Sequence, residues 1–180
     1  MARPKNTPND PQRRQRILTA TMELLQDSGI ASVTARSVAN RAEVPVGSVS
    51  YHFDSVKGLL LQASHELLGR RTAQIAEWDY PSTGGAAVLK QLAELIHHQV
   101  TTGRALTVVS YELYLLGLRD PDFQQVSAHT VGTLRKKLLE NFSSEHATHL
   151  AAVADGYQLQ ALFDQEPPSV ESILTTLRAA

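Results

Sequence analysis

The chain has 180 residues, a formal net charge of −1 at pH 7 and no cysteine. Without cysteine there can be no disulfide bond and no thiolate metal site, which is compatible with a reducing cytoplasm. No apolar run approaches the ~20 residues that a membrane span requires, so we expect neither a span nor a signal peptide. The length suits a small N-terminal domain followed by one further domain of ordinary size.

Charge is distributed unevenly along the chain. Up to Lys57 there are eight Lys or Arg and five Asp or Glu, a net charge of +3, and the remainder has nine against thirteen, a net charge of −4. A basic part joined to an acidic remainder is typical of a DNA-binding domain on a sensor domain. A net charge of +3 is modest, so we expect two copies to bind DNA together.

The first predicted helix begins near Asp10 and Pro11 and ends before Gly29. An aspartate cap followed by proline in the first turn favours a helix start, and a glycine just past the last apolar residue is the expected C-terminal cap. The apolar face of this helix consists of Ile17, Leu18, Met22, Leu24 and Leu25.

Residues 33–53 indicate two short helices joined by a tight turn. Thr34 is a suitable N-cap for the first helix, whose small apolar face of Val38, Ala39 and Ala42 lets a second helix cross closely. This is the build of a helix-turn-helix, which places its second helix in the DNA major groove. The alternative is a structural helix hairpin that does not bind DNA.

The second short helix is expected to have Pro45 in its first turn, where the missing N–H is tolerated. Val44 and Val49 supply the apolar contacts that fix its crossing angle. The residues then left to face outward are Val46, Gly47, Ser48, Ser50, Tyr51 and His52.

The three predicted helices, ending in Tyr51-His52-Phe53, form a DNA-binding head that resembles the tetracycline-repressor-like (TetR) family of bacterial regulators over about Arg16 to Leu60. The resemblance implies an all-α fold. A helix-turn-helix domain at residues 1–54 is joined by a long helix to a helical ligand-binding and dimerisation domain at residues 55–180.

Four positions depart from the family pattern. Glu43 stands where the family usually has glycine in the turn, and Pro45 stands where a serine or threonine cap is usual. Ser50 replaces a favoured tyrosine. The lysine that commonly begins the fourth helix aligns with Val56, and Lys57 follows one position later, about 100° around the helix.

By resemblance, phosphate contacts are expected from Thr34, Tyr51, His52 and Lys57. Base-edge contacts are expected from Arg36, Val46, Gly47, Ser48 and Ser50.

Beyond residue 54 the pattern predicts only helices. The fourth runs from about Ser55 to Asp79, and a very apolar helix, Leu106 to Leu118, is expected to be buried on most sides. Long apolar stripes follow at residues 123–142 and 150–161, and a short helix, Val170 to Leu177, ends the chain.

The two stripes could lie inside one subunit or form a dimer bundle, and the family resemblance favours the dimer. Gly156 would allow close helix approach across such a bundle. The predicted interface residues are Val126, Leu134, Leu138, Val153, Tyr157 and Ala161.

A ligand pocket is expected on the resemblance and on the few aromatic and polar residues of the helical domain, namely Trp78, His97, Tyr111, Glu112, Tyr114 and Phe163. Plain core or surface positions remain the alternative for each of them. His146 and His149 have metal-ligand spacing without a third ligand nearby, so no metal and no cofactor is predicted.

The function implied is that of a ligand-responsive regulator, by default a repressor, that binds double-stranded DNA at a near-palindromic operator as a cytoplasmic homodimer. An effector of unknown identity would change the separation of the two heads. One alternative is an architectural DNA-binding protein without an effector. The other is an enzyme, for which the sequence offers no phosphate loop, nucleophile elbow or zinc-protease motif.

Overall fold

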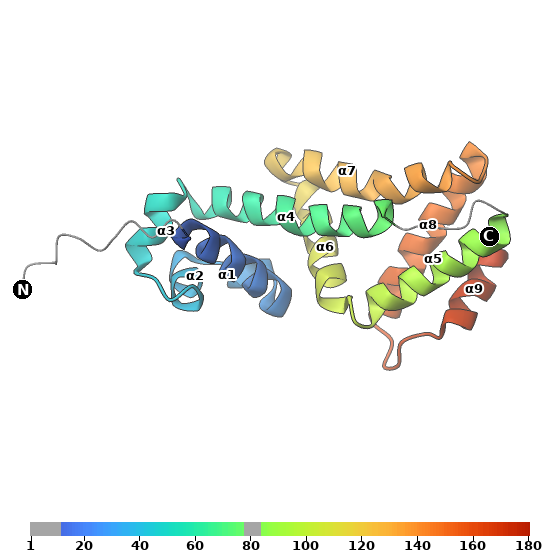
Figure 1. Ribbon diagram of the computed structural model, residues 1–180, viewed down its shortest axis with the longest axis horizontal. Coiled ribbons are helices and arrows are strands. Elements are labelled where there is room, and N and C mark those ends of the chain that lie inside the picture. Colours follow the sequence, from blue (N-terminus) through green and yellow to red (C-terminus); the bar gives the residue numbers. More distant parts are fainter. Residues whose placement is uncertain (1–11, 78–83) are drawn as a thin grey trace, which may run out of the picture. The chain divides into compact units, whose positions relative to one another are not determined.

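A computed structural model describes residues 12–77 and 84–180, and all regular structure in these ranges is helical (Figure 1). The expected all-α fold is confirmed. The helices are α1 (Arg13–Ser28), the 3-10 helix η1 (Ile30–Ser32), α2 (Ala35–Arg41), α3 (Val46–His52), α4 (Val56–Ala76), α5 (Gly85–Val100), α6 (Arg104–Gly117), α7 (Pro121–Leu138), α8 (Ser144–Ala161) and α9 (Val170–Arg178).

The chain forms two compact units that divide between Ser64 and His65. The division therefore falls inside α4, ten residues after the boundary predicted at residues 54 and 55. A hydrogen bond of 2.6 Å from an Arg14 Nη of α1 to the Gln62 Oε1 of α4 also joins this part of α4 to the N-terminal unit. The first turns of α4 belong to the N-terminal unit (12–64), and its remaining turns belong to the C-terminal unit (65–180).

Local signals set the helix ends of the N-terminal unit. Gly29 has a φ of 74°, and its N–H closes α1 on the Leu25 carbonyl, as predicted. Thr34 caps α2 through a reciprocal pair of bonds with Ser37, which confirms its predicted role. The helix begins at Arg13 with Gln12 at the N-cap, and the predicted cap at Asp10 and Pro11 lies outside the described residues.

Serine and aspartate caps begin the later helices. Asp120 caps α7, with Pro121 in its first turn, and Ser143 and Ser169 cap α8 and α9. α4 ends at Ala76, short of the predicted Asp79, which lies outside the described residues. No helix among the described residues is long and apolar enough to cross a membrane.

In the C-terminal unit, α5 packs against α9 and α6 packs against α7. The larger of two apolar clusters among the described residues of this unit joins α5, α7, α8 and α9 around fully buried residues such as Leu92, Leu138, Leu150 and Ile173. Burial of this core, at about 25 cal/mol for each Å² of apolar surface, is the main force that holds these helices together.

The expectation that the sixth helix is buried on most sides is wrong. Leu115 is 65% exposed and Leu118 is 81% exposed. The buried face of α6 includes Thr107, Ser110 and Leu113 instead, because these side chains face the rest of the unit at helical spacing.

The predicted dimer interface also needs correction. Val126, Leu134, Leu138 and Ala161 are at most 9% exposed in a single chain, so they belong to its internal packing and cannot form an open interface. Val153 and Tyr157 are partly buried and pack against the same core. Most residues of the two apolar stripes thus pack inside one subunit, the alternative left open by the pattern, while Val131 is 47% exposed.

Candidate DNA interface and ligand cavity

The helix α3 is held by its apolar residues and presents its polar residues to solvent. Val49 is 2% exposed, and the Phe53 that follows the helix is 6% exposed. The opposite face is open, because Val46 is 47% exposed and Tyr51 is 78% exposed. No residue of α3 is acidic, so its exposed face carries no charge that would repel phosphate.

The residues predicted to contact DNA lie at or near the surface of the N-terminal unit. His52 and Ser48 are half-buried, and the ring of His52 meets the ring of Tyr51 edge-on at 5.0 Å. The exposed members of the predicted set are Thr34, Arg36, Val46, Gly47, Ser50, Tyr51 and Lys57.

Gly47 has no structural reason to lack a side chain. A Cβ added there would meet no heavy atom within 4 Å, and the backbone is ordinary right-handed helix. Glycine inside a helix is unfavourable by roughly 0.5–1 kcal/mol relative to alanine. The bare backbone therefore weakens α3 slightly while leaving room for close approach from outside.

The turn between α2 and α3 keeps a left-handed residue even though glycine is absent. Glu43 has a φ of 54°, the only positive φ of a non-glycine residue in the described ranges. The N–H of Val44 donates to the carbonyl of Ala39 across the turn at 3.0 Å. Pro45 is the N-cap and not the first helical residue, which corrects its predicted position by one residue.

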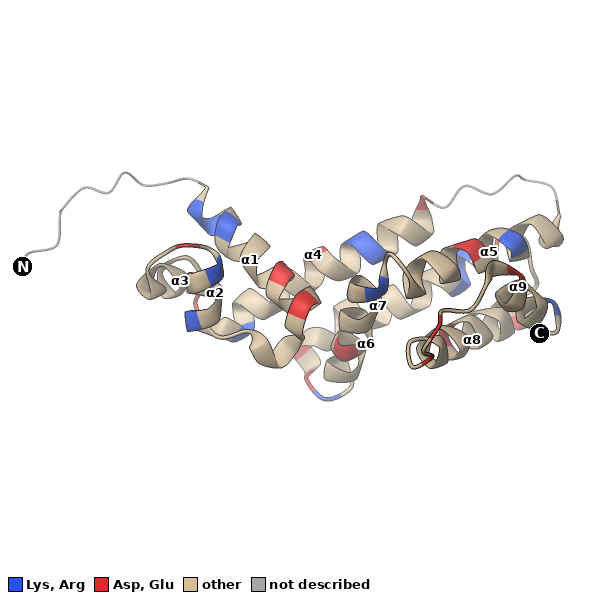
Figure 2. Cartoon of the chain, turned by 90° about the horizontal axis from the view of Figure 1, so that it is seen from below, with Lys and Arg blue, Asp and Glu red and all other residues tan. Residues whose placement is uncertain are grey.

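Basic residues gather at the N-terminal turn of α1, where Arg13, Arg14 and Arg16 lie (Figure 2). Arg14 also lies over the ring of Phe53 at 4.9 Å. Arg41 is engaged elsewhere, since it forms ion pairs with Asp27 at 2.9 Å and with Glu23 at 3.3 Å. These carboxylates raise the pKa of Arg41 and tie the end of α2 to α1.

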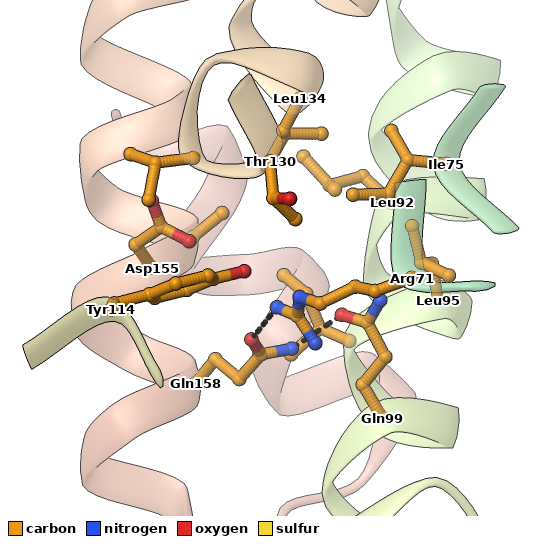
Figure 3. Close-up of a pocket in the computed structure, with 13 residues that line it drawn as sticks. Arg71, Ile75, Leu92, Leu95, Gln99, Tyr114, Thr130, Leu134, Asp155 and Gln158 are labelled. Carbon is orange, nitrogen blue, oxygen red and sulfur yellow. Dashed lines mark hydrogen bonds between the residues drawn. The ribbon is translucent and has the colours of Figure 1, made fainter. Parts of the chain in front are cut away.

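The C-terminal unit contains a small cavity with a polar and an apolar side (Figure 3). It is bounded by residues of α4, α5, α6, α7 and α8. The free space between the side chains is about 20 Å³, room for one water molecule. The lining residues are Arg71, Ile75, Leu92, Leu95, Ile96, Gln99, Tyr114, Thr130, Val131, Leu134, Ala154, Asp155 and Gln158.

A buried hydrogen-bond network forms the polar side. Arg71, which is 4% exposed, donates to Gln158 Oε1 at 2.6 Å and to Thr107 Oγ1 at 3.3 Å. Gln158 Nε2 donates in turn to Gln99 Oε1. Tyr111 stands behind the network, and its hydroxyl donates to the Asp155 carbonyl at 3.0 Å and to Gln158 Oε1 at 3.2 Å.

Burial shifts the ionisable groups of this cavity. It raises the pKa of Tyr114 and of Asp155, while the positive charge of Arg71 opposes both shifts. Burial also raises the pKa of Tyr111. Both phenols therefore remain neutral at physiological pH, and Asp155 holds its charge less readily than a carboxylate in water.

Of the described residues that were predicted to line a pocket, Tyr114 alone lines this cavity. Tyr111 supports it from behind, while Glu112 is not among the lining residues. His97 Nδ1 instead contacts the Pro168 carbonyl at 2.9 Å, where it anchors the segment before α9. Phe163 is 85% exposed, so its prediction is wrong, and Trp78 lies outside the described residues.

Arg71, Gln99 and Gln158 were missed as cavity residues. Each sits within an apolar helical stripe: Arg71 between Leu68 and Ile75, and Gln99 beside Val100. A polar residue at a core position was the available signal, since such a side chain has to find buried partners. No group of three potential metal ligands occurs in the described ranges, and His146 and His149 line only a shallow surface hollow.

A capped α2, a tight turn and an exposed α3 define a helix-turn-helix DNA-binding protein, here attached to a helical unit with its own cavity. Two family models match it. One describes bacterial regulatory proteins of the tetR family and covers residues 17–63, and the other describes the tetracycline repressor-like C-terminal domain and covers residues 83–180. The chain belongs to the TetR family of bacterial transcriptional regulators.

Individual relatives agree with this assignment. The transcriptional repressor KstR of Mycobacterium tuberculosis is 39% identical over 82 residues, which cover 45% of this chain and 36% of KstR. The crystal structure of the transcriptional regulator SCO7518 of Streptomyces coelicolor A3(2) has a TM-score of 0.80 at 30% identity and covers 94% of this chain and 98% of that one. The multidrug binding protein EbrR, solved with ethidium, has a TM-score of 0.77 at 31% identity and covers 95% and 99%.

Proposed function

We propose that this regulator is a repressor that binds a near-palindromic operator as a homodimer and releases it when a small molecule enters the cavity. The observation that carries the proposal is α3, a helix held by buried Val49 whose exposed face is uncharged or polar. A helix of this kind fits the major groove, where serine hydroxyls reach base edges. The chain would act in the cytoplasm, by binding and not by catalysis.

Within this proposal the predicted contacts keep their roles. Thr34, Tyr51, His52 and Lys57 would position the protein on phosphates, and Arg36, Val46, Gly47, Ser48 and Ser50 would face the bases. Phosphate contacts give affinity without sequence information, whereas base contacts give preference. The two sets can therefore be told apart by experiment.

Lys57 offers the most direct test of a phosphate contact. If its ammonium neutralises a phosphate, Lys57→Ala should weaken binding to all sequences alike and reduce the slope of log affinity against log salt by about one. Lys90→Ala is a matched control, because Lys90 is an exposed lysine of α5 in the C-terminal unit. An unchanged slope for Lys57→Ala would show that Lys57 does not make the phosphate contact of the lysine that the family usually has at the position of Val56.

We place the dimer contact on the outward face of α8. Thr148, Ala152 and Leu159 repeat there at helical spacing, Phe163 follows in the turn after the helix, and all four are exposed in a single chain. A Cβ on Gly156, within the same stripe, would meet no atom of its own chain within 4 Å, so a second copy of α8 could approach closely. Two α8 helices would form an isologous, two-fold contact of the kind that presents two heads to two half-sites.

The link between cavity and head would be α4. Arg71 and Ile75 of this helix line the cavity, and its first turns belong to the N-terminal unit. A ligand that displaces Arg71 would move the helix that both units share. Loss of operator binding on addition of a small molecule supports this repressor over an architectural DNA-binding protein, which would stay bound.

A further inference from the structure

The cavity contains a positive charge whose hydrogen-bond partners are neutral. Arg71 is almost fully buried, and its acceptors include the Gln158 amide and the Thr107 hydroxyl, with the neutral Tyr114 hydroxyl also beside it. A buried guanidinium is normally paired with a carboxylate, because an uncompensated charge is costly in a medium of low dielectric. Asp155 lines the same cavity, yet Arg71 forms no salt bridge with it or with any other described residue.

The network also leaves one donor open. Arg71 can only donate, so Gln158 must turn its oxygen toward it and its nitrogen toward Gln99. Gln99 must then turn its oxygen to Gln158. Its own nitrogen, Nε2, is buried without a hydrogen-bond partner in the described ranges. An orphaned buried donor of this kind is unfavourable by about 1–3 kcal/mol until an acceptor arrives.

The donors of the polar side include Arg71 and Gln99 Nε2, and apolar carbon lines the other side. Figure 3 shows the Tyr114 hydroxyl directed toward the Arg71 guanidinium, with Ile75, Leu92 and Leu134 together on one side of it. A ligand that fits both sides has a small anionic acceptor group on an apolar body. Asp155 on the same cavity would repel a group with two negative charges, which favours a monoanion.

We propose that the effector of this regulator is a small carboxylic acid, with its carboxylate on Arg71 and Gln99 Nε2 and its apolar body against Ile75, Leu92 and Leu134. The inference rests on the proposed function, since it names the chemistry of the molecule that releases the operator. It also separates this chain from EbrR, which was solved with the cation ethidium. A buried arginine opposes cation binding at this position.

The free space of about 20 Å³ is too small for such a molecule. Binding must therefore displace the side chains around the cavity, and Arg71 has two hydrogen bonds that it can exchange for a carboxylate. A bidentate guanidinium–carboxylate pair is stronger than bonds to a neutral amide and a hydroxyl. This exchange of hydrogen-bond partners supplies the driving force for opening the cavity. It acts directly on α4, because Arg71 belongs to that helix.

The test uses the full-length protein and a series of straight-chain carboxylates from butanoate to decanoate, with the n-alkylamines of equal length and ethidium as cationic comparators. Thermal unfolding and titration calorimetry measure binding, and a labelled operator fragment measures release. We expect the carboxylates to raise the unfolding temperature and to release the operator, with an optimum chain length. The amines of equal length should do neither.

Substitutions of the cavity residues test which side chains bind the carboxylate. Arg71→Met should lower carboxylate affinity on the order of a hundredfold, and Arg71→Lys should recover part of it because the charge remains. Gln99→Leu should lower it on the order of tenfold through loss of one donor. Arg70→Met is the matched control, since Arg70 is the exposed neighbour on α4 and does not line the cavity.

The contrary outcomes are distinct. Release by amines or ethidium and not by carboxylates overturns this inference and leaves the proposed repressor intact. Carboxylate binding that Arg71→Met and Gln99→Leu do not weaken also overturns it, since the acid then binds elsewhere. Failure of the protein to bind any operator fragment overturns the proposed function itself, whatever the calorimetry shows.

Discussion

The N-terminal unit presents its proposed DNA contacts at its surface, most of them on α3, whereas the C-terminal unit buries its polar groups among five helices. Tyr51 is 78% exposed on α3, and Arg71 is 4% exposed in the cavity. A surface that reads DNA has to be preformed and accessible. A site that responds to a small molecule benefits from being closed and under-satisfied until the ligand arrives.

The two regions also differ in how far apart their partners lie along the chain. The cap that begins α2 joins Thr34 to Ser37, three positions away. The hydrogen bond that orients Arg71 reaches Gln158, 87 positions away. Local bonds make the helix-turn-helix robust to distant changes, while the cavity depends on the packing of the whole C-terminal unit.

The largest expected effect separates the core of the C-terminal unit from the proposed dimer face. Leu138 is fully buried, so Leu138→Ala should lower the free energy of unfolding by about 3 kcal/mol. Leu134→Glu should unfold the unit, because it places a charge in the same core.

Leu159→Ala is the matched change on the exposed face of α8, and it should alter the stability of the subunit by less than about 0.5 kcal/mol while weakening dimerisation. Chemical denaturation followed by circular dichroism and sedimentation measures both. If Leu134→Glu instead gives a folded helical monomer, the burial of α7 is misassigned.

Changes on α3 should affect DNA binding without affecting the fold. Ser50→Ala should relax preference at one operator position per half-site, with a loss of about 1–3 kcal/mol for a specific contact. Tyr51→Phe should weaken binding to all sequences similarly, because its proposed contact is with phosphate. A binding-site selection with each variant separates the two behaviours. If the Ser50→Ala protein keeps the wild-type sequence preference, we would assign the base contact to Arg36 instead.

The turn residue Glu43 tests stored strain in the N-terminal unit. A left-handed conformation disfavours residues other than glycine by roughly 1–2 kcal/mol. We expect Glu43→Gly to raise the free energy of unfolding by about 1 kcal/mol, measured by denaturation. Gln26→Gly, in an ordinary helical position of α1, should lower it by a similar amount. Destabilisation by both changes would contradict the strain at Glu43.

Gly47 should show opposite effects on stability and on binding. Gly47→Ala adds a Cβ in open space on a helix, so the unfolding free energy should rise by roughly 0.5–1 kcal/mol. Operator affinity should fall, because the same methyl group would stand between α3 and the groove. Equal or better affinity for the alanine variant would show that DNA does not approach this backbone.

The smallest effect concerns the pH dependence of the C-terminal unit. Burial raises the pKa of Asp155 above its ordinary value of 3.8, so the folded protein binds this proton more tightly than the unfolded chain. The stability contribution of this group is therefore present below that value and is lost as pH rises through the raised pKa.

Asp155→Asn removes the titration and should gain stability relative to the wild type from acidic to neutral pH. Denaturation across that range measures the difference. The attraction of Arg71 for the ionised carboxylate is already part of the net raised pKa, so a difference that shrinks toward neutral pH would contradict the assigned shift.

Short-range rules were sufficient for much of the N-terminal unit. Gly29 and Thr34 were predicted as caps because the groups that they satisfy lie within four residues. The same short-range rules also located the turn between α2 and α3. Glu43 in this turn adopts the left-handed conformation that suits the glycine usual in the family.

The C-terminal unit could be predicted only as a set of helices. An apolar stripe indicates that a helix face is covered, but it does not indicate which element covers it. Leu138 and Ala161 could therefore equally have met a partner subunit. The cavity was missed for the same reason. Arg71, Gln99 and Gln158 come from α4, α5 and α8 and meet only after these three helices have packed. Their place within apolar stripes marks them as core positions but does not show which side chains they meet.

The central claim, that α3 reads DNA for a paired protein, is tested most directly by selecting bound fragments from the genomic DNA of the host with the wild-type protein and with a Ser48→Ala/Ser50→Ala double variant. We predict that the wild type enriches an inverted repeat whose half-sites are centred about one helical turn, or a whole number of turns, apart. The double variant should lose this preference symmetrically in both half-sites. Enrichment of a single, non-repeated site, or of the same repeat by both proteins, would contradict the account.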